Sequence, residues 1–208
     1  MQKIFLPYNK VRNDAIKLAH KIYSDGFIPD VIYVSLRGGS DLGNVISEYF
    51  KLAEVKSEAE SKKTKKTLFA ALVAHSYTGM EITSKVIVDG WTYPPEKLKS
   101  TDKILLVDDI FDTGNTVNDL VKILLDTGIP RSNIKVAVHD YKYVTYKETQ
   151  LPIQPDYWCV RYEITKPDDD IWIHYLSHEL FGLQDEELKK YYYSEDSELE
   201  DILEPLLK

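Results

Sequence analysis

The feature that most constrains the fold is a short apolar run, Ile104–Val107, followed directly by two carboxylates, Asp108 and Asp109. A continuous apolar run of this length is typical of a strand that is buried on both faces of a parallel sheet. Beyond a polar turn, apolar residues recur at helical spacing from Val117 to Leu125 and predict an amphipathic helix. This order of strand, acidic turn, small-residue loop and helix predicts an α/β fold with a ligand site beyond the carboxyl end of the strand.

The turn between that strand and helix has the composition of a sugar-phosphate site. A third carboxylate, Asp112, precedes the sequence Thr-Gly-Asn-Thr at 113–116. Backbone N–H groups of a small-residue loop that runs into a helix form an anion site, and the threonine hydroxyls add donors. Carboxylates beside a phosphate repel it unless the ligand also brings sugar hydroxyls or Mg²⁺. A ribose phosphate satisfies all of these demands.

Residues 107–116 resemble the phosphoribosyl-pyrophosphate motif of the type I phosphoribosyltransferases. That motif consists of a hydrophobic strand, two acids, two variable residues, Asp-Thr-Gly, one further residue and Thr. The resemblance implies that Asp108 and Asp109 hold the ribose hydroxyls, directly or through metal. It also implies that residues 112–116 cradle the 5′-phosphate and that Asp112 is the acid/base for a purine ring nitrogen. The alternative is a helix N-cap whose acids only stabilise the helix dipole.

A second strand, loop and helix precede the first. A β-branched strand at 31–35 leads into Leu36-Arg37-Gly38-Gly39-Ser40, and a helix is predicted at about 41–52. The glycine loop and the planar guanidinium of Arg37 suit phosphate oxygens, with a plain tight turn as the alternative. The loop resembles the pyrophosphate loop of the same family. Members of the family often have a cis peptide before the basic residue, and here that bond would join Leu36 and Arg37.

A mobile loop is suggested by Ser76 and Tyr77, which follow an apolar strand predicted at 68–74. The pair resembles the start of the loop that closes over the active site in purine phosphoribosyltransferases. Closure would exclude water from a reactive sugar centre, where water would hydrolyse the substrate. The Lys-rich segment 62–66 that precedes this strand is interpreted as solvated surface, with a patch that attracts phosphates as the alternative.

Three residues resemble the family's base-binding groups. Lys142 follows a strand predicted at 135–139 and would donate to the exocyclic oxygen of a 6-oxopurine, with a surface lysine as the alternative. Trp172 would stack on the purine and Ile173 would offer its main chain, with a core tryptophan as the alternative. Glu179 stands where family members have a carboxylate that binds a second Mg²⁺.

The chain also departs from the family pattern. Residues 175–179, Tyr-Leu-Ser-His-Glu, replace the aromatic-proline-tryptophan-acid ending of some xanthine and guanine enzymes. Residues 183–185 lack the arginine of the hypoxanthine-guanine pattern, so the choice of base and the second-metal geometry stay open. His174 and His178 have a spacing found in zinc sites, but no third ligand pattern accompanies them.

Composition limits the possible partners. The 208 residues carry 26 basic and 34 acidic side chains, a net charge of −8, which argues against binding to nucleic acid or to anionic membranes. The N-terminus lacks an apolar signal core, and we expect a cytoplasmic protein. The single cysteine, Cys159, lies in an apolar stretch and is interpreted as a core residue.

Together these features predict a twisted, mainly parallel α/β sheet flanked by helices, the type I phosphoribosyltransferase fold. We expect one domain over 1–208, with a small hood from about 1–8 and 143–182, a helical tail at about 184–208, and a homodimer or higher homo-oligomer. The residues expected to bind phosphoribosyl pyrophosphate are Leu36, Arg37, Gly38, Gly39, Ser76, Tyr77, Asp108, Asp109, Asp112, Thr113, Gly114, Asn115 and Thr116. Those expected to bind the purine are Lys142, Trp172 and Ile173, and the expected metal ligands are Asp108, Asp109 and Glu179.

The resemblance implies Mg²⁺-dependent transfer of 5-phosphoribose from phosphoribosyl pyrophosphate to a 6-oxopurine, as in purine salvage. The products would be a purine nucleoside monophosphate and pyrophosphate. Two alternatives remain open. One is an enzyme of the same fold that acts on a pyrimidine such as orotate. The other is a nonenzymatic regulator that senses phosphoribosyl pyrophosphate with the same motif.

Overall fold

The computed structural model describes residues 2–60, 66–76, 86–146 and 151–207. The chain divides into two compact units. The larger unit contains residues 9–170, and the smaller contains residues 2–8 and 171–208. Within the described residues, no helix is long and apolar enough to cross a membrane.

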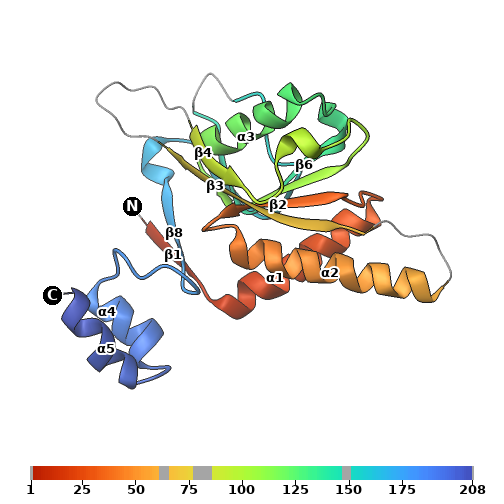
Figure 1. Ribbon diagram of the computed structural model, residues 1–208. Coiled ribbons are helices and arrows are strands. Elements are labelled where there is room, and N and C mark those ends of the chain that lie inside the picture. The colour runs from red at the N-terminus through yellow and green to blue at the C-terminus, as the bar shows by residue number, and fades with distance from the viewer. Residues whose placement is uncertain (1, 61–65, 77–85, 147–150, 208) are drawn as a thin grey trace. The chain divides into compact units, whose positions relative to one another are not determined.

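The larger unit is built on a six-stranded sheet with the order β4-β3-β2-β5-β6-β7 (Figure 1). All neighbouring strands are parallel except β3 and β4, which are antiparallel. The predicted α/β fold with a mainly parallel sheet is therefore confirmed. The strands are β2 (Val31–Leu36), β3 (Leu68–Ser76), β4 (Val86–Trp91), β5 (Ile104–Phe111), β6 (Ile134–Val144) and β7 (Tyr157–Ile164).

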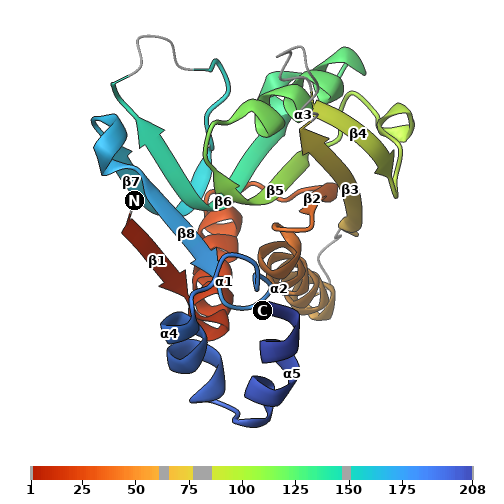
Figure 2. The ribbon, with the colours of Figure 1, turned by 90° about the vertical axis from the view of Figure 1, so that its left-hand side faces the viewer.

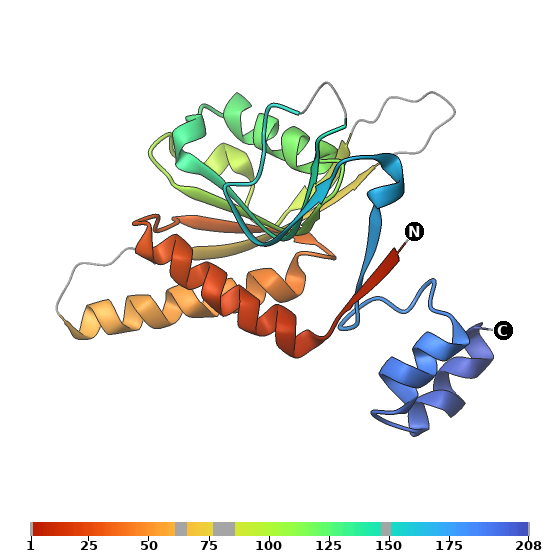
Figure 3. The ribbon, with the colours of Figure 1, turned by 180° about the vertical axis from the view of Figure 1, so that it is seen from behind.

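Helices cover both faces of this sheet (Figure 3). Helices α1 (Tyr8–Ser24) and α2 (Ser40–Ala59) pack on one face, and α3 (Asn115–Asp126) packs on the other. The central strand β5 shows why its sequence is apolar without alternation. Ile104 and Leu106 are buried beneath α3, whereas Leu105 and Val107 are buried beneath α1 and α2. Short 3₁₀ turns lie at Pro95–Lys97, Arg131–Asn133 and Pro167–Asp169.

Several strands are longer than the sequence predicted, and the extensions of β5 and β6 are the largest. Strand β5 does not end at Val107 but includes both carboxylates that follow, and β6 continues from the predicted 135–139 to Val144. The reason is sheet pairing, because β6 is hydrogen-bonded to β5 as far as Tyr141 and to β7 as far as its own end. Lys142 therefore lies within a strand and not just beyond one.

The smaller unit consists of two parallel strands and a helical tail (Figure 2). Strand β1 (Gln2–Leu6) pairs with β8 (Ile171–Tyr175), and the tail contains α4 (Asp185–Leu188), a π-helical turn (Lys189–Tyr193) and α5 (Glu198–Leu207). The Phe5 ring stacks on Tyr191 at a centroid distance of 4.5 Å, and Lys3 Nζ lies 2.7 Å from Glu187 Oε2. Residues 143–170, which the sequence analysis assigned to the hood, group with the larger unit. The organisation into one domain with a hood stays a prediction.

The single cysteine lies on β7 in the larger unit and is partly buried. Burial raises the pKa of the Cys159 thiol to about 12, and the negative charges of Asp14 and Asp140 act in the same direction. Its thiol therefore stays protonated at physiological pH, as the interpretation of a core residue requires.

Candidate functional site

A cavity of about 270 Å³ lies at the carboxyl ends of β2 and β5. These strands are parallel neighbours, so the turns that follow them meet at one edge of the sheet. The cavity brings together most residues that the sequence assigned to the sugar phosphate. Its lining consists of Ser35, Leu36, Gly38, Ala74, Asp108, Asp109, Ile110, Asp112, Thr113, Gly114, Thr116 and Val117.

The turn after β5 depends on one glycine. Gly114 has a φ of +80°, in the left-handed region, and a Cβ at this position would lie 2.3 Å from the Phe111 ring. Helix α3 begins at the next residue, so Asn115 and Thr116 lie in its first turn. The Asn115 N–H donates to Thr113 Oγ1 at 3.5 Å, and the amides of a first helical turn, which lack intrahelical acceptors, can serve an anion.

Sequence reasoning missed a residue that holds this turn. The Asn118 side chain donates to Gly114 O at 3.0 Å and to Ile153 O at 2.9 Å, and it accepts from the Ile153 N–H at 3.0 Å. It ties the phosphate-sized loop to a segment far away in sequence. No local pattern could have revealed this bridge, because its partner lies 35 residues further along the chain.

The turn after β2 brings a backbone close to the carboxylates of β5. The Leu36–Arg37 peptide is cis, as expected from the resemblance, and Arg37 is exposed. A Cβ on Gly38 would lie 2.1 Å from Asp109 Oδ2. A Cβ on Gly39 would lie 2.9 Å from the backbone oxygens of Ser35 and Val107. Glycine is thus required here because the two turns approach each other more closely than any side chain would allow.

The adjacent carboxylates of β5 are electrostatically costly. Burial raises the pKa of Asp108 well above its usual range, and repulsion from Asp109 raises it further. The backbone N–H of Asp109 donates to Asp108 Oδ1 at 3.1 Å, and the N–H of Ile110 donates to Asp109 Oδ1 at 2.8 Å. Part of the Asp108 surface stays accessible. Such a pair favours a ligand that brings hydroxyl donors or a cation.

The carboxylate oxygens of Asp108 and Asp109 suit an Mg²⁺ ion that is also bound by a substrate. Among the described residues, no three His, Cys, Asp or Glu side chains gather into a metal-binding group. Mg²⁺ is often held by only one or two carboxylates together with water and substrate phosphates. Asp108 and Asp109 fit that pattern, whereas the zinc hypothesis for His174 and His178 finds no third ligand within the described chain.

Lys142 lies beside the loop that follows β5. Its side chain is 5% exposed, so the alternative of a surface lysine is wrong. The ammonium donates to Asp170 Oδ1 at 2.9 Å and forms an ion pair with Asp112 Oδ1 at 3.1 Å. Asp170, the last of three consecutive aspartates, is a second residue that the sequence analysis missed.

Three of the remaining candidates, Trp172, Ile173 and Glu179, lie on the smaller unit. Trp172 is 53% exposed on β8 and is not a core tryptophan, whereas the Ile173 side chain is buried. The Glu179 carboxylate accepts the Tyr175 N–H at 3.0 Å and lies 3.6 Å from His174 Nδ1. Ser76 is the last residue of β3, and Tyr77 lies outside the described residues.

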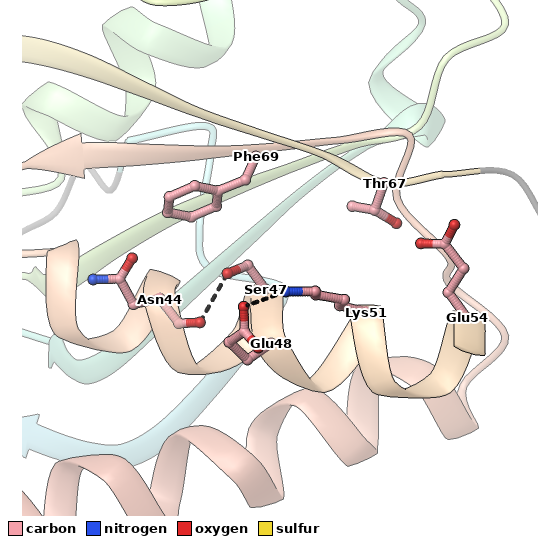
Figure 4. A pocket seen from close by; sticks show the side chains of 7 residues that line it. All are labelled: Asn44, Ser47, Glu48, Lys51, Glu54, Thr67 and Phe69. Carbon is pink, nitrogen blue, oxygen red and sulfur yellow. Dashed lines mark hydrogen bonds and ion pairs between the residues drawn. The ribbon is translucent and has the colours of Figure 1, made fainter. Parts of the chain in front are cut away.

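A second cavity of about 430 Å³ lies along α2 and contains none of the expected site residues. Figure 4 shows one side of the helix facing the first residues of β3 across it. Lys51 Nζ lies 3.3 Å from Glu48 Oε1, and the Ser47 hydroxyl donates to Asn44 O at 2.8 Å. The lining residues are Asn44, Ser47, Glu48, Lys51, Glu54, Thr67 and Phe69.

The model of the phosphoribosyl transferase domain family matches residues 2–177. A comparison with curated proteins returned no significant match. A purine phosphoribosyltransferase from Pyrococcus horikoshii has a TM-score of 0.62 at 22% identity, over 88% of this chain and 99% of that one. A hypothetical protein from Neisseria gonorrhoeae with bound ppGpp has a TM-score of 0.62 at 20% identity, over 93% and 97%. The xanthine-guanine-hypoxanthine phosphoribosyltransferase of Helicobacter pylori has a TM-score of 0.53 at 16% identity, over 85% and 92%. At these identities the structural likeness establishes the fold.

Proposed function

The chain is a phosphoribosyltransferase that belongs to the phosphoribosyl transferase domain family, and from this premise we propose that its acceptor is a 6-oxopurine. The reaction would move 5-phosphoribose from phosphoribosyl pyrophosphate to a ring nitrogen of the base, with Mg²⁺. It would yield a purine nucleoside monophosphate and pyrophosphate, as a purine salvage enzyme does. The observation that carries the choice of acceptor is the buried ammonium of Lys142 beside Asp112.

The cavity at the ends of β2 and β5 is the proposed site for phosphoribosyl pyrophosphate. The turn after β5 offers amides and hydroxyls to the 5′-phosphate, and the turn after β2 offers Arg37 and the close backbone at Gly38 and Gly39 to the pyrophosphate. Ser76 and Tyr77 are proposed to belong to the loop that covers the bound substrate. The strongest support is that the two glycine turns meet at one edge of the sheet.

Asp108 and Asp109 are the proposed contacts for the ribose hydroxyls and for Mg²⁺, and Glu179 is proposed for a second ion. When bound, Mg²⁺ would supply positive charge that offsets the charge of the departing pyrophosphate. The neighbouring carboxylates also favour the positive charge that develops on the ribose as the bond to pyrophosphate lengthens. Most of the rate enhancement would then come from positioning and charge.

Hydrogen-bond donors would recognise the base, and Asp112 would exchange a proton with its ring nitrogen. Lysine can only donate hydrogen bonds, so Lys142 suits a carbonyl oxygen at purine position 6 and disfavours an amino group there. Asp112 is about half exposed at the mouth of the cavity and 3.1 Å from that ammonium, and it is the proposed acid/base for the ring nitrogen.

The proposal for Trp172 and Ile173 rests on the resemblance together with the exposed ring of Trp172. Stacking on an aromatic side chain contributes about 1–3 kcal/mol per base in nucleic-acid complexes. Replacing Trp172 with Ala is therefore expected to raise the KM for the purine by roughly tenfold. An unchanged KM for the purine would remove Trp172 from the base site.

The test is pyrophosphate release with Mg²⁺ and phosphoribosyl pyrophosphate. Hypoxanthine, guanine, xanthine, adenine, uracil and orotate are each supplied alone. Release with one or more oxopurines, and little with adenine, is the expected result. Release only with a pyrimidine would overturn the proposed acceptor and the assignment of Lys142. Tight binding of phosphoribosyl pyrophosphate without release by any base would overturn the proposed reaction and favour the sensing regulator.

A further inference from the structure

We propose that Asp170 is a positioning residue that acts through Lys142. It anchors the Lys142 ammonium between the acid/base Asp112 and the exocyclic oxygen of the bound purine. This inference rests on the proposed function, because it concerns the residue that aims the proposed base reader. Asp170 does not line the cavity proposed for phosphoribosyl pyrophosphate, and its effect on the reaction would pass through the ammonium that it holds.

The geometry around Lys142 is that of a buried ammonium with two carboxylates. Lys142 is 5% exposed, and taking such a charge out of water is costly unless acceptors surround it. Asp170 Oδ1 accepts a hydrogen bond at 2.9 Å, and Asp112 Oδ1 lies at 3.1 Å. The side chain of Asp170 is 37% exposed and that of Asp112 is 55% exposed. Asp170 is thus the more enclosed anchor, and Asp112 is the partner that faces the cavity.

An ammonium has three N–H donors. One of them is donated to Asp170, and Asp112 Oδ1 lies 3.1 Å from the ammonium as an ion-pair partner, so the two carboxylates limit where the ammonium can point. A donor that is not used by Asp170 would then serve the carbonyl oxygen of a 6-oxopurine. Without Asp170, only Asp112 would hold the flexible lysine side chain, and the ammonium would no longer be fixed in an orientation that suits the purine oxygen.

The backbone holds Asp170 where this role requires it. Strand β7 pairs with β6 in parallel, and Tyr162 stands opposite Lys142. The chain then makes the 3₁₀ turn Pro167–Asp169, and the Asp170 N–H donates to Pro167 O at 3.2 Å. The turn directs the last of three consecutive aspartates to Lys142, whereas the Asp169 carboxylate accepts from Thr165 Oγ1 at 2.5 Å.

The experiment replaces Asp170 with Asn, which keeps the shape and removes the charge. A hydrogen bond to a charged group contributes enough that kcat/KM for the oxopurine is expected to fall roughly ten- to hundredfold. The KM for phosphoribosyl pyrophosphate should stay unchanged, because Asp170 does not line its cavity. The matched control is Asp168→Asn, an exposed aspartate of the same run, which should leave both constants unchanged.

A double-mutant cycle separates action through Lys142 from a merely structural role. In a Lys142→Met background, adding Asp170→Asn should change neither kcat/KM nor the affinity for the purine nucleoside monophosphate, measured by titration calorimetry. This comparison holds even where Asp170→Asn alone destabilises the chain, because the double variant removes both charges.

Two outcomes would overturn the inference. One is full activity of Asp170→Asn with the preferred oxopurine. The other is a further loss of product affinity when Asp170→Asn is added to Lys142→Met. Both presuppose an active wild-type enzyme, so they leave the proposed function standing. A wild-type chain that is inactive with every oxopurine would instead contradict the proposed function itself.

Discussion

Two cavities lined by described residues of the larger unit differ in how they are built. The larger, of about 430 Å³, lies between one face of α2 and the start of β3 and is lined by side chains of mixed character. The smaller, of about 270 Å³, lies where two glycine turns and two adjacent carboxylates converge. Backbone that converges at strand ends therefore distinguishes the candidate site from the other cavity better than volume does.

The difference has a physical origin. Along α2, Lys51 already pairs with Glu48, and an exposed helix face tolerates substitution. At the strand ends, glycines at positions 38, 39 and 114 remove side chains where neighbouring atoms leave no room. The carboxylates there repel each other in the absence of a ligand. The second arrangement costs stability and is best explained by ligand binding.

The largest effect of a substitution is expected at Asp112, which lines the smaller cavity. Replacing Asp112 with Asn should lower kcat by roughly 10²- to 10⁴-fold, the usual contribution of a general acid or base, with smaller changes in both KM values. Steady-state kinetics with the preferred oxopurine measure this. Equal losses in binding and turnover would contradict the assigned role of Asp112.

Gly38 tests whether close backbone approach matters. In Gly38→Ala the new methyl group would meet the Asp109 carboxylate and displace it. We expect kcat/KM for phosphoribosyl pyrophosphate to fall by about tenfold or more, since a misplaced contact of this kind costs 1–2 kcal/mol. Gly90→Ala is the matched control, because a Cβ there would meet no atom within 4 Å. Similar kinetics for the two variants would argue against a crowded site.

Asp108 tests whether the site costs stability. Its pKa in the folded chain is raised above the ordinary value of 3.8 by burial and then by Asp109. The folded state therefore binds this proton more tightly than the unfolded state does. The resulting stabilisation is complete below the unfolded pKa and is lost as pH rises through the raised pKa. At neutral pH the burial of this carboxyl group beside Asp109 therefore lowers the free energy of unfolding.

Asp108→Asn should consequently raise Tm at neutral pH, by about 2–4 °C for each kcal/mol relieved, while weakening activity. The advantage should shrink as pH falls toward 4. Thermal unfolding across pH 4–8 gives the readout, with wild-type protein scanned in parallel. A Tm difference between variant and wild type that grows as the pH falls would contradict a raised pKa of Asp108.

The smallest effects are expected at the cavity along α2. Lys51→Ala and Phe69→Ser should each leave kcat and both KM values within about twofold, because exposed substitutions away from the site change free energies by about 0.5 kcal/mol or less. A tenfold loss of activity in either variant would reverse the comparison between the two cavities.

Local sequence was enough to predict the core of this fold. The apolar run before Asp108, the glycine turns and the two helices that follow them each carry short-range signals, and the structure confirms the elements that these predict. The acidic carboxyl end of β5 and the polar carboxyl end of β6 were not predicted as strand. Hydrogen bonding to the neighbouring strands outweighs the low strand propensity of the residues there.

The parts of the candidate site that escaped prediction are long-range. Asn118 reaches Ile153, and Lys142 reaches Asp170, across 35 and 28 residues. Both links exist only because β7 returns alongside β6, and no spacing rule encodes such contacts. The roles assigned to Trp172, Ile173 and Glu179 stay predictions.

The single thiol of the chain has a practical consequence for spectroscopy. Because burial raises the pKa of the Cys159 thiol to about 12, the thiol stays protonated near neutral pH. Maleimides and other reagents that need a thiolate should therefore react with it very slowly. The native protein thus already serves as a background for site-specific labelling. A cysteine introduced at exposed Phe181, paired with another on α2, would carry fluorophores whose energy transfer reports the spacing between the two units as substrates bind.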